Sequence, residues 1–132
     1  MFSIQMQVRD YECDLQGVVN NANYMHYFEH ARHQYLHDLG INFADYTAQQ
    51  IHLMLVRAEL DFKASLRPND EFTVTVTMER ESRIKYAFVQ TIIRNEDQKV
   101  MCVGRNIGVA LNPNGRPVVF EPFEAVLEEA IK

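Results

Sequence analysis

The sequence has no long apolar stretch and very few cysteines. A membrane-spanning helix needs about 20 consecutive apolar residues, and no such run occurs although 47% of the residues are hydrophobic. Apolar and polar residues alternate over residues 1–6 instead of forming the core of a signal peptide, so we expect a cytoplasmic protein. Cys13 and Cys102 are the only cysteines, which excludes a disulfide framework or zinc ribbon and predicts two reduced, partly buried thiols.

Positive charge is also scarce. The 13 lysines and arginines are outnumbered by 18 acidic residues, for a net charge of −5. Nucleic-acid-binding domains need a basic surface to displace counterions from phosphates, so we expect no nucleic-acid partner. A small phosphate-bearing ligand needs only a local patch, which Arg80, Arg83 and Lys85 could provide. The interpretation that we favour is that these are solvated charges at a hairpin turn.

The strongest periodicity predicts one long helix from residue 22 to residue 39. Asn20 or Asn21 can cap its start, and Gly40 suits the left-handed position after its last turn. The apolar stripe at three- and four-residue steps consists of Tyr24, Phe28, Ala31, Tyr35 and Leu39. A length of 132 residues suits a single domain, residues 1–132, with a real core.

Alternating patterns predict five strands around this helix. They cover residues 2–8, about 51–64, 72–78, 84–94 and 99–111. Short turns join antiparallel neighbours, so the expected fold class is α+β, with a long central helix wrapped by a five-stranded antiparallel sheet. Gly104 and Gly108 lie on one face of the last strand, where we expect close approach to the helix. A helical turn is expected within residues 41–50, and a short helix after Pro122.

The second predicted strand points to a homo-oligomer. Residues 53–56 are apolar on both faces, and beyond them Val56, Ala58, Leu60 and Phe62 alternate with charged residues. One helix cannot cover both faces and both edges of the sheet. We therefore expect a homodimer or a dimer of dimers, in which a partner subunit covers this strand.

An acidic loop, residues 9–20, leads directly into the long helix. Asp14 and Gly17 stand just before the capping asparagines, so a carboxylate is delivered to a helix N-terminus, where free backbone N–H groups favour developing negative charge. Cys13 is a poor candidate nucleophile because no paired base is visible and its side chain should point away from that of Asp14.

Residues 14–24, DLQGVVNNANY, resemble the signature of hotdog-fold acyl-CoA thioesterases of the 4-hydroxybenzoyl-CoA thioesterase family. Weaker likeness continues at residues 56–57, 62, 67–68, 70, 115–117 and 122. Residues 17–19 are similar to the branch associated with the Tol-Pal gene cluster, and residues 20–22 to the long-chain acyl-CoA and acyl-carrier-protein thioesterases. Val18 and Asn21 stand where those branches carry histidine, so no loop histidine is available as a base.

The resemblance implies hydrolysis of an acyl thioester to a carboxylic acid and free coenzyme A, without a cofactor. Asp14 would be the nucleophile or the general base, the Asn21 N–H the oxyanion donor, and Gly17 would allow close approach of the thioester. The implied substrate-binding residues are Val18, Val19, Asn20, Tyr24 and, from a second subunit, Arg57.

Other interpretations remain open for the same residues. Asn20 and Asn21 could only cap the helix, and core packing is the commoner role for Tyr24. The substrate could be an acyl-carrier-protein thioester, or the chain a noncatalytic acyl-binding module that would not need Asp14. A hydratase is disfavoured, because Val18 and Val19 stand where it would need a histidine.

Four histidines follow one line of the predicted helix, and residues 26–30 match the H-x-x-E-H pattern of inverted zincins. At about 100° per residue, this row lies opposite the apolar stripe. No third ligand within a closed pocket is evident. We therefore expect a solvated or subunit-facing row and no metal site, formed by His26, His30, His33 and His37.

Overall fold

The computed structural model describes residues 1–131, and Lys132 lies outside the described residues. All five predicted strands and the long helix are present within two residues of their expected bounds. The elements are β1 (Phe2–Gln7), the 3-10 turn η1 (Asp10–Glu12), α1 (Asn21–Asp38), α2 (Phe43–Ala48), β2 (His52–Phe62), β3 (Glu71–Arg80), β4 (Lys85–Arg94), β5 (Lys99–Leu111), β6 (Pro117–Val118) and α3 (Glu121–Ile131).

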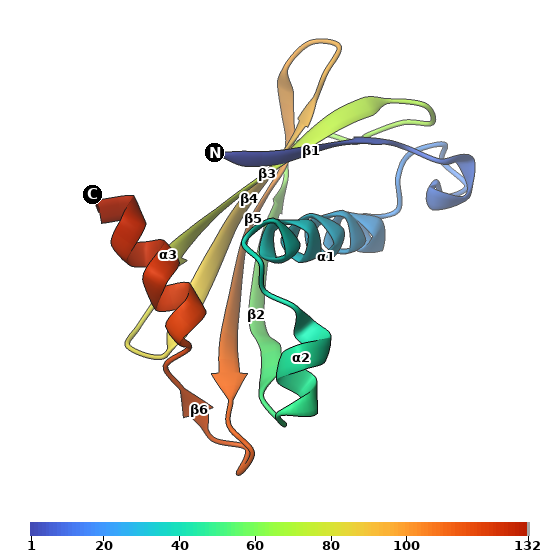
Figure 1. Cartoon of the computed structure of the whole chain (residues 1–132). Helices are drawn as coiled ribbons and strands as arrows, with labels where there is room; N and C mark the ends of the chain where they lie inside the picture. The colour runs from blue at the N-terminus through green and yellow to red at the C-terminus, as the bar shows by residue number, and fades with distance from the viewer. Residues whose placement is uncertain (132) are drawn as a thin grey trace.

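The strands form one antiparallel sheet with the order β1-β3-β4-β5-β2. The two-residue strand β6 pairs with β5 and was not predicted, because two residues carry no periodicity. Helix α1 lies across one face of the sheet, with α2 and α3 packed beside it toward the far end of the strands (Figure 1). No helix within residues 1–131 is both long and apolar enough to span a membrane.

Helix α1 follows the predicted periodicity. The Asn20 side chain accepts a hydrogen bond from the Ala22 N–H at 3.0 Å and caps the start. Gly40, with φ of +80°, follows the last turn in the left-handed conformation. Leu39 departs from the prediction because it forms the C-cap and is exposed. The side chains of α1 that face the sheet are those of Tyr24, Tyr27, Phe28, Ala31, Arg32, Tyr35 and Leu36.

The close approach expected at the two glycines of β5 has two different causes. A Cβ atom at Gly104 would lie 2.7 Å from the Phe28 ring, so this glycine lets α1 lie close against the sheet. A Cβ atom at Gly108 would instead lie 3.2 Å from the Met54 carbonyl oxygen. The expectation of contact with α1 is therefore confirmed at Gly104 and wrong at Gly108, which makes room for the backbone of β2.

Strand β2 is an edge of the sheet, and its alternation is broken once. The register with β5 shifts between Leu55 and Arg57, as at a β-bulge. Val56 consequently lies with Met54 and Arg57 beside a hollow on the face away from α1. The prediction that Val56 shares a face with Ala58 is wrong because an inserted residue reverses the side-chain alternation at that point.

Glu12, in η1, fixes the chain between β1 and α1. Its buried carboxylate accepts hydrogen bonds from the Arg9 N–H at 2.8 Å, the Arg9 guanidinium at 3.2 Å and the Tyr27 hydroxyl at 3.0 Å. Its backbone carbonyl accepts from the Asn20 N–H at 3.0 Å and the Asn23 side chain at 2.8 Å. One residue therefore ties the acidic loop to the first turns of α1.

We predict that Gly104→Ala destabilises the protein by about 1–3 kcal/mol, because the added methyl group overpacks the contact with Phe28. In a Phe28→Leu background, which lacks the ring atoms nearest to position 104, the added penalty should fall to less than half. Urea unfolding of the four proteins measures both penalties. Equal penalties in the two backgrounds would show that the ring does not set the helix-to-sheet distance.

Glu12→Gln should lower the free energy of unfolding by about 1–3 kcal/mol, since an amide cannot accept all three hydrogen bonds of the carboxylate. Glu96→Gln is the matched control, because Glu96 is exposed in the β4–β5 turn, and it should change stability by less than about 0.5 kcal/mol. Thermal or urea unfolding gives both values. An equal effect of the two substitutions would contradict the anchoring role of Glu12.

Candidate active site

Asp14 stands at the start of a tight hairpin that precedes α1. An isolated antiparallel bridge joins Cys13 to Val19, and the Asp14 N–H donates to the Val18 carbonyl at 2.9 Å. The Gly17 N–H donates back to the Asp14 carbonyl at 3.0 Å, and Gly17 has a φ of +75°, which favours glycine. These backbone hydrogen bonds shape the hairpin without involving the Oδ2 atom of the Asp14 carboxylate.

The Asp14 carboxylate is exposed to solvent within this chain. Its Oδ1 atom accepts a hydrogen bond from the Gln16 N–H at 2.8 Å, and no cation of residues 1–131 lies within 4.0 Å of it. Leu15, next in the chain, is fully exposed at 107% relative accessibility, and Tyr11 is exposed as well. The Asp14 carboxylate therefore has no cationic partner, and the apolar side chains next to it are exposed to solvent within one subunit.

The first turn of α1 follows directly. Of the two asparagines predicted to cap α1, Asn20 is the N-cap and Asn21 is the first helical residue. The Asn20 and Asn23 N–H groups have acceptors in the Glu12 and Asn20 carbonyls, whereas no acceptor for the Asn21 N–H occurs among the described residues. This free donor lies at the positive end of an 18-residue helix.

The side chains predicted around the loop take different positions. Val19 is buried and Val18 half-buried. Tyr24 is buried, and its hydroxyl accepts a hydrogen bond from the Leu66 N–H at 2.9 Å; burial raises the pKa of this hydroxyl. Tyr24 is thus a core residue that joins α1 to the chain after β2. Arg57 is exposed on the opposite face of the sheet and pairs with Glu59 at 2.9 Å, so within one subunit it does not join the loop residues.

The loop is also tied to the C-terminal end of β2. The Val19 N–H donates to the Leu66 carbonyl at 2.9 Å, and the Tyr24 ring packs edge-on against Phe62 with centroids 5.5 Å apart. Wherever the end of β2 lies in an assembly, Asp14 and the start of α1 lie near it.

Both cysteines are unsuited to nucleophilic catalysis. Burial raises the pKa of the Cys102 thiol to about 12 and also raises that of the Cys13 thiol, to which the neighbouring acidic residues contribute. Both thiols are free and protonated near neutral pH, so neither supplies the reactive thiolate.

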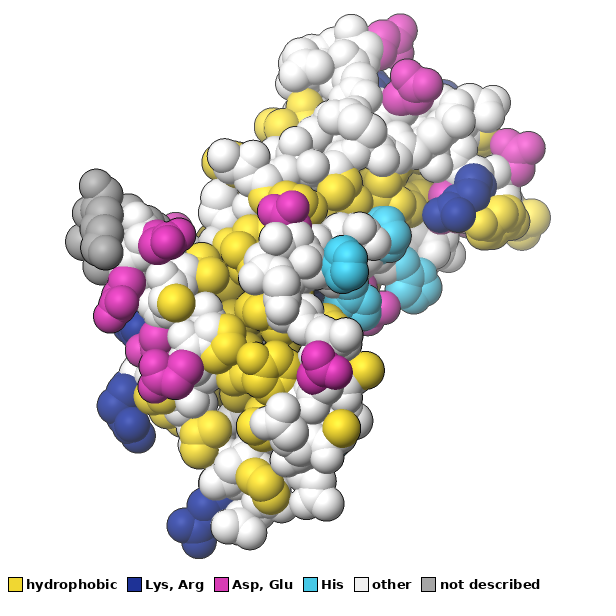
Figure 2. Space-filling view, in the orientation of Figure 1, with side chains coloured by type: hydrophobic (Ala, Val, Ile, Leu, Met, Phe, Trp, Pro, Cys, Tyr) yellow, Lys and Arg dark blue, Asp and Glu magenta, His cyan; other side chains and the backbone are white. Residues whose placement is uncertain are grey.

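The four histidines of the row are exposed on α1 (Figure 2), but His33 departs from the predicted solvated row, because its ring packs edge-on against Phe43 with centroids 5.1 Å apart and it lines a cavity. Residues 1–131 contain no group of three or more histidine, cysteine, aspartate or glutamate side chains placed to hold a metal ion. Within the basic cluster near the β3–β4 turn, the Arg80 guanidinium pairs with Glu124 of α3 at 2.7 Å. This interaction occupies one charge of the cluster that could have bound phosphate.

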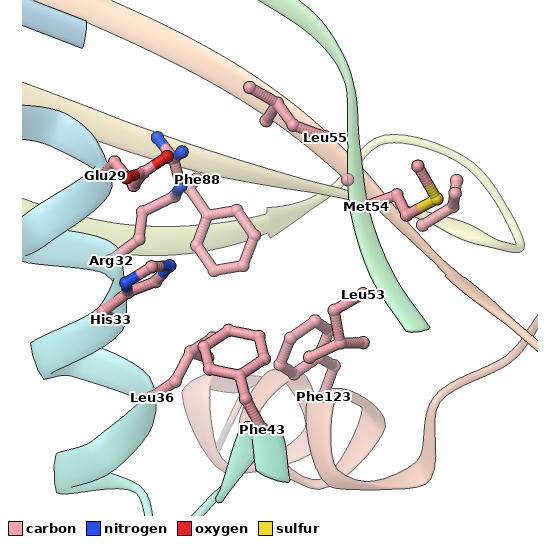
Figure 3. Close-up of a pocket in the computed structure, with 12 residues that line it drawn as sticks. Glu29, Arg32, His33, Leu36, Phe43, Leu53, Met54, Leu55, Phe88 and Phe123 are labelled. Atoms are coloured by element: carbon pink, nitrogen blue, oxygen red, sulfur yellow. The ribbon is translucent and has the colours of Figure 1, made fainter. Parts of the chain in front are cut away.

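A polar cluster beneath α1 was not predicted from the sequence. The Gln90 side chain of β4 donates to the Phe28 carbonyl at 2.9 Å and accepts from Arg32 at 3.1 Å and from Asn106 at 3.0 Å. Arg32 also lines a cavity of about 160 Å³ bounded by α1, α2, β2 and α3 (Figure 3). The helical wheel contained this signal, because Arg32 falls four residues after Phe28 on the buried side.

Comparisons with known proteins agree with this architecture. Residues 8–131 match the family described as the Thioesterase-like superfamily. The chloroplastic acyl-acyl carrier protein thioesterase ATL3 of Arabidopsis thaliana is 33% identical over 115 residues, 87% of this chain and 60% of the relative. Acyl-CoA thioesterase YbgC of Haemophilus influenzae is 30% identical over 97 residues, 71% of this chain and 70% of the relative. This chain spans about three fifths of the length of its Arabidopsis relatives.

Solved structures share the fold over nearly the whole chain. A 1,4-dihydroxy-2-naphthoyl-CoA thioesterase from Synechocystis aligns with a TM-score of 0.90 over 99% of this chain and 98% of that one, at 19% identity. A hypothetical protein from Aquifex aeolicus gives a TM-score of 0.86 over 96% and 99%, at 26% identity. These likenesses do not separate the Tol-Pal-associated branch from the long-chain branch. They confirm the predicted hotdog fold, and the chain belongs to the Thioesterase-like superfamily.

Proposed function

We propose that the protein hydrolyses an acyl-CoA thioester to a carboxylic acid and free coenzyme A. The observation that carries this proposal is the exposed Asp14 carboxylate on a hairpin that leads directly to the free Asn21 N–H at the start of α1. Membership of the superfamily and relatives named as thioesterases support it.

In the proposed reaction, Asp14 either attacks the thioester carbonyl or removes a proton from the attacking water. The carbonyl oxygen becomes negatively charged, and the Asn21 N–H, with the positive end of α1 behind it, stabilises that charge. The C–S bond then breaks, and coenzyme A leaves as the thiol. A mixed anhydride formed by direct attack would be hydrolysed by water in a second step.

Acyl-carrier-protein thioesters are the second candidate substrate. Two Arabidopsis relatives, 33% and 32% identical, are named acyl-acyl carrier protein thioesterases. Parallel assays of the same acyl group on coenzyme A and on carrier protein, with detection of free thiol, distinguish the two carriers. The carrier with the higher kcat/KM is the substrate class.

We further propose that the active unit is a homodimer joined along β2. This 11-residue edge strand exposes backbone hydrogen-bonding groups on one side. Its side chains include Met54, Val56 and Phe62, with exposed fractions of 49%, 52% and 48%. An apolar strand of this length with a free edge favours pairing with a second copy across a two-fold axis.

Asp14→Asn should leave a folded protein and lower kcat by orders of magnitude, because asparagine keeps the acceptor for the Gln16 N–H but is neither nucleophile nor base. Asp10→Asn, an exposed acid of the same loop, is the matched control and should keep wild-type activity. The free-thiol assay measures both variants. Activity of Asp14→Asn within about threefold of wild type corresponds to a change of only ~0.65 kcal/mol in the activation barrier and would contradict the catalytic role of Asp14.

Val56→Lys should give a folded monomer with little activity, because a charge on the edge strand opposes pairing. Val100→Lys, which places the same charge at an exposed apolar position of β5, should remain dimeric and active. Sedimentation and activity are measured at the same protein concentration. A monomer that keeps full activity would show that the site is complete in one subunit.

A further inference from the structure

The cavity beneath α1 is apolar except on one side. Its walls include Leu36, Phe43, Leu53, Phe88 and Phe123, and its polar side is formed by Glu29, Arg32 and His33 of α1. Figure 3 shows Glu29, Arg32, His33 and Leu36 along one side of the cavity, with the rings of Phe88 and Phe43 beside them and Leu53 on the far side. On the surface, hydrophobic side chains gather between α2 and α3 at the same place (Figure 2).

Arg32 is buried there without a carboxylate partner. Its relative exposure is 9%, and its one recorded hydrogen bond runs to the neutral Gln90 side chain at 3.1 Å. Within residues 1–131, no acidic oxygen lies within 4.0 Å of the guanidinium. Burial lowers the pKa of Arg32, and the more distant Glu29 charge only partly opposes this. A guanidinium has five N–H donors, so most of its donors have no acceptor in the chain.

The Arg32 nitrogens without a protein partner are accessible at the cavity wall, since Asn106 Oδ1 alone among the fully buried side-chain N and O atoms of residues 1–131 lacks a hydrogen bond. A ligand that displaces water there without offering an acceptor would leave a charged group buried and unpaired, which is energetically unfavourable. Because Gln90 donates to the Phe28 carbonyl, its Oε1 atom must accept from both Arg32 and Asn106. This fixes the Asn106 amide with its Oδ1 atom buried and without a donor. The network holds the guanidinium in place at the cavity wall without neutralising it, as expected for a group that binds an acceptor on a ligand.

The proposed dimer connects this cavity to the candidate active site. When two copies of β2 pair antiparallel about a two-fold axis at the middle of the strand, the Phe62 end of one lies beside the His52 end of the other. The hairpin with Asp14 is tied to the Phe62 end, and Leu53 lines the cavity. In that dimer the partner subunit's Asp14 lies toward the His52 end of β2, where Leu53 forms part of the cavity wall.

We propose that Arg32 determines substrate specificity: it donates hydrogen bonds to an oxygen that the acyl group carries remote from the thioester, while the apolar walls hold the hydrocarbon part. This inference rests on the proposed thioesterase function. The favoured substrates are then acyl thioesters with a distal carboxylate or hydroxyl group, in preference to unsubstituted chains of equal length.

Matched thioesters of coenzyme A test the proposal: octanoyl, 8-hydroxyoctanoyl and the mono-thioester of octanedioic acid. Wild-type kcat/KM should be at least tenfold higher for an oxygenated substrate than for octanoyl-CoA. Arg32→Met should reduce this preference at least tenfold, Arg32→Lys should retain part of it, and Arg116→Met, an exposed arginine away from the cavity, should leave it unchanged. Equal rates in wild type, or an unchanged preference in a folded Arg32→Met protein, would overturn the role of Arg32.

Binding separates this inference from the proposed function. Calorimetric dissociation constants for the three thioesters, measured on Asp14→Asn, do not depend on turnover. Tighter binding of the oxygenated thioesters supports Arg32 even if no hydrolysis occurs, whereas absence of hydrolysis in wild type contradicts only the thioesterase assignment. Equal dissociation constants contradict the Arg32 proposal, and because they use a variant with intact Arg32 they do so even if Arg32→Met fails to fold.

Discussion

The position of α1 against the sheet depends on the contact between the Phe28 ring and Gly104. An added Cβ atom at position 104 would lie 2.7 Å from the ring, so any other residue there requires a shift of the Phe28 ring or of the helix that carries it. One rigid helix carries the Asn21 N–H at its first residue and Arg32 eleven residues later, about 16 Å along its axis. This single contact therefore positions the candidate oxyanion donor and the buried guanidinium together.

The loop before α1 separates structural and chemical roles between two carboxylates. Glu12 is buried and accepts three hydrogen bonds, one of which comes from Tyr27, whose pKa is raised by burial and by this bond. Asp14, two residues later, is exposed and accepts one bond from a neighbouring backbone group. Because backbone bonds and Gly17 shape the hairpin, the Asp14 carboxylate can change its bonding during a reaction without loss of the loop structure.

Much of the fold followed from periodicity, whereas the exceptions arose from tertiary contacts. Tyr24, Phe28 and Tyr35 are buried on α1 because a 3.6-residue repeat fixes one face toward the sheet. The bulge at Val56 depends instead on how the backbone of β2 passes Gly108, and no local pattern encodes that register.

The candidate site was predictable to a similar extent. The sequence located Asp14, Gly17 and the capping asparagines, because turns and caps are local. The prediction for Arg57 concerns a second subunit, and within one subunit Arg57 lies on the outer face, apart from the loop residues. Arg32 was missed because a charged residue is normally assigned to the solvent side of a helix. Its hydrogen-bond partner Gln90 lies 58 residues further along the chain, and Asn106 of β5 bonds to the same Gln90 oxygen.

The two positive features of α1 also bear on how a substrate would be oriented. The chain is acidic overall, at −5, so the helix N-terminus and the Arg32 guanidinium are local exceptions, and both lie next to the apolar edge strand β2. An acyl thioester with a distal oxygen presents two acceptors joined by hydrocarbon. In the proposed dimer, the start of α1 in one subunit and Arg32 of the other are two fixed donors on either side of an apolar surface, and they match that pattern in one direction only. An unsubstituted chain can satisfy the thioester end but leaves the buried charge without an acceptor. In the proposed function, selectivity then arises from the unfavourable burial of Arg32 in every complex that lacks a distal oxygen.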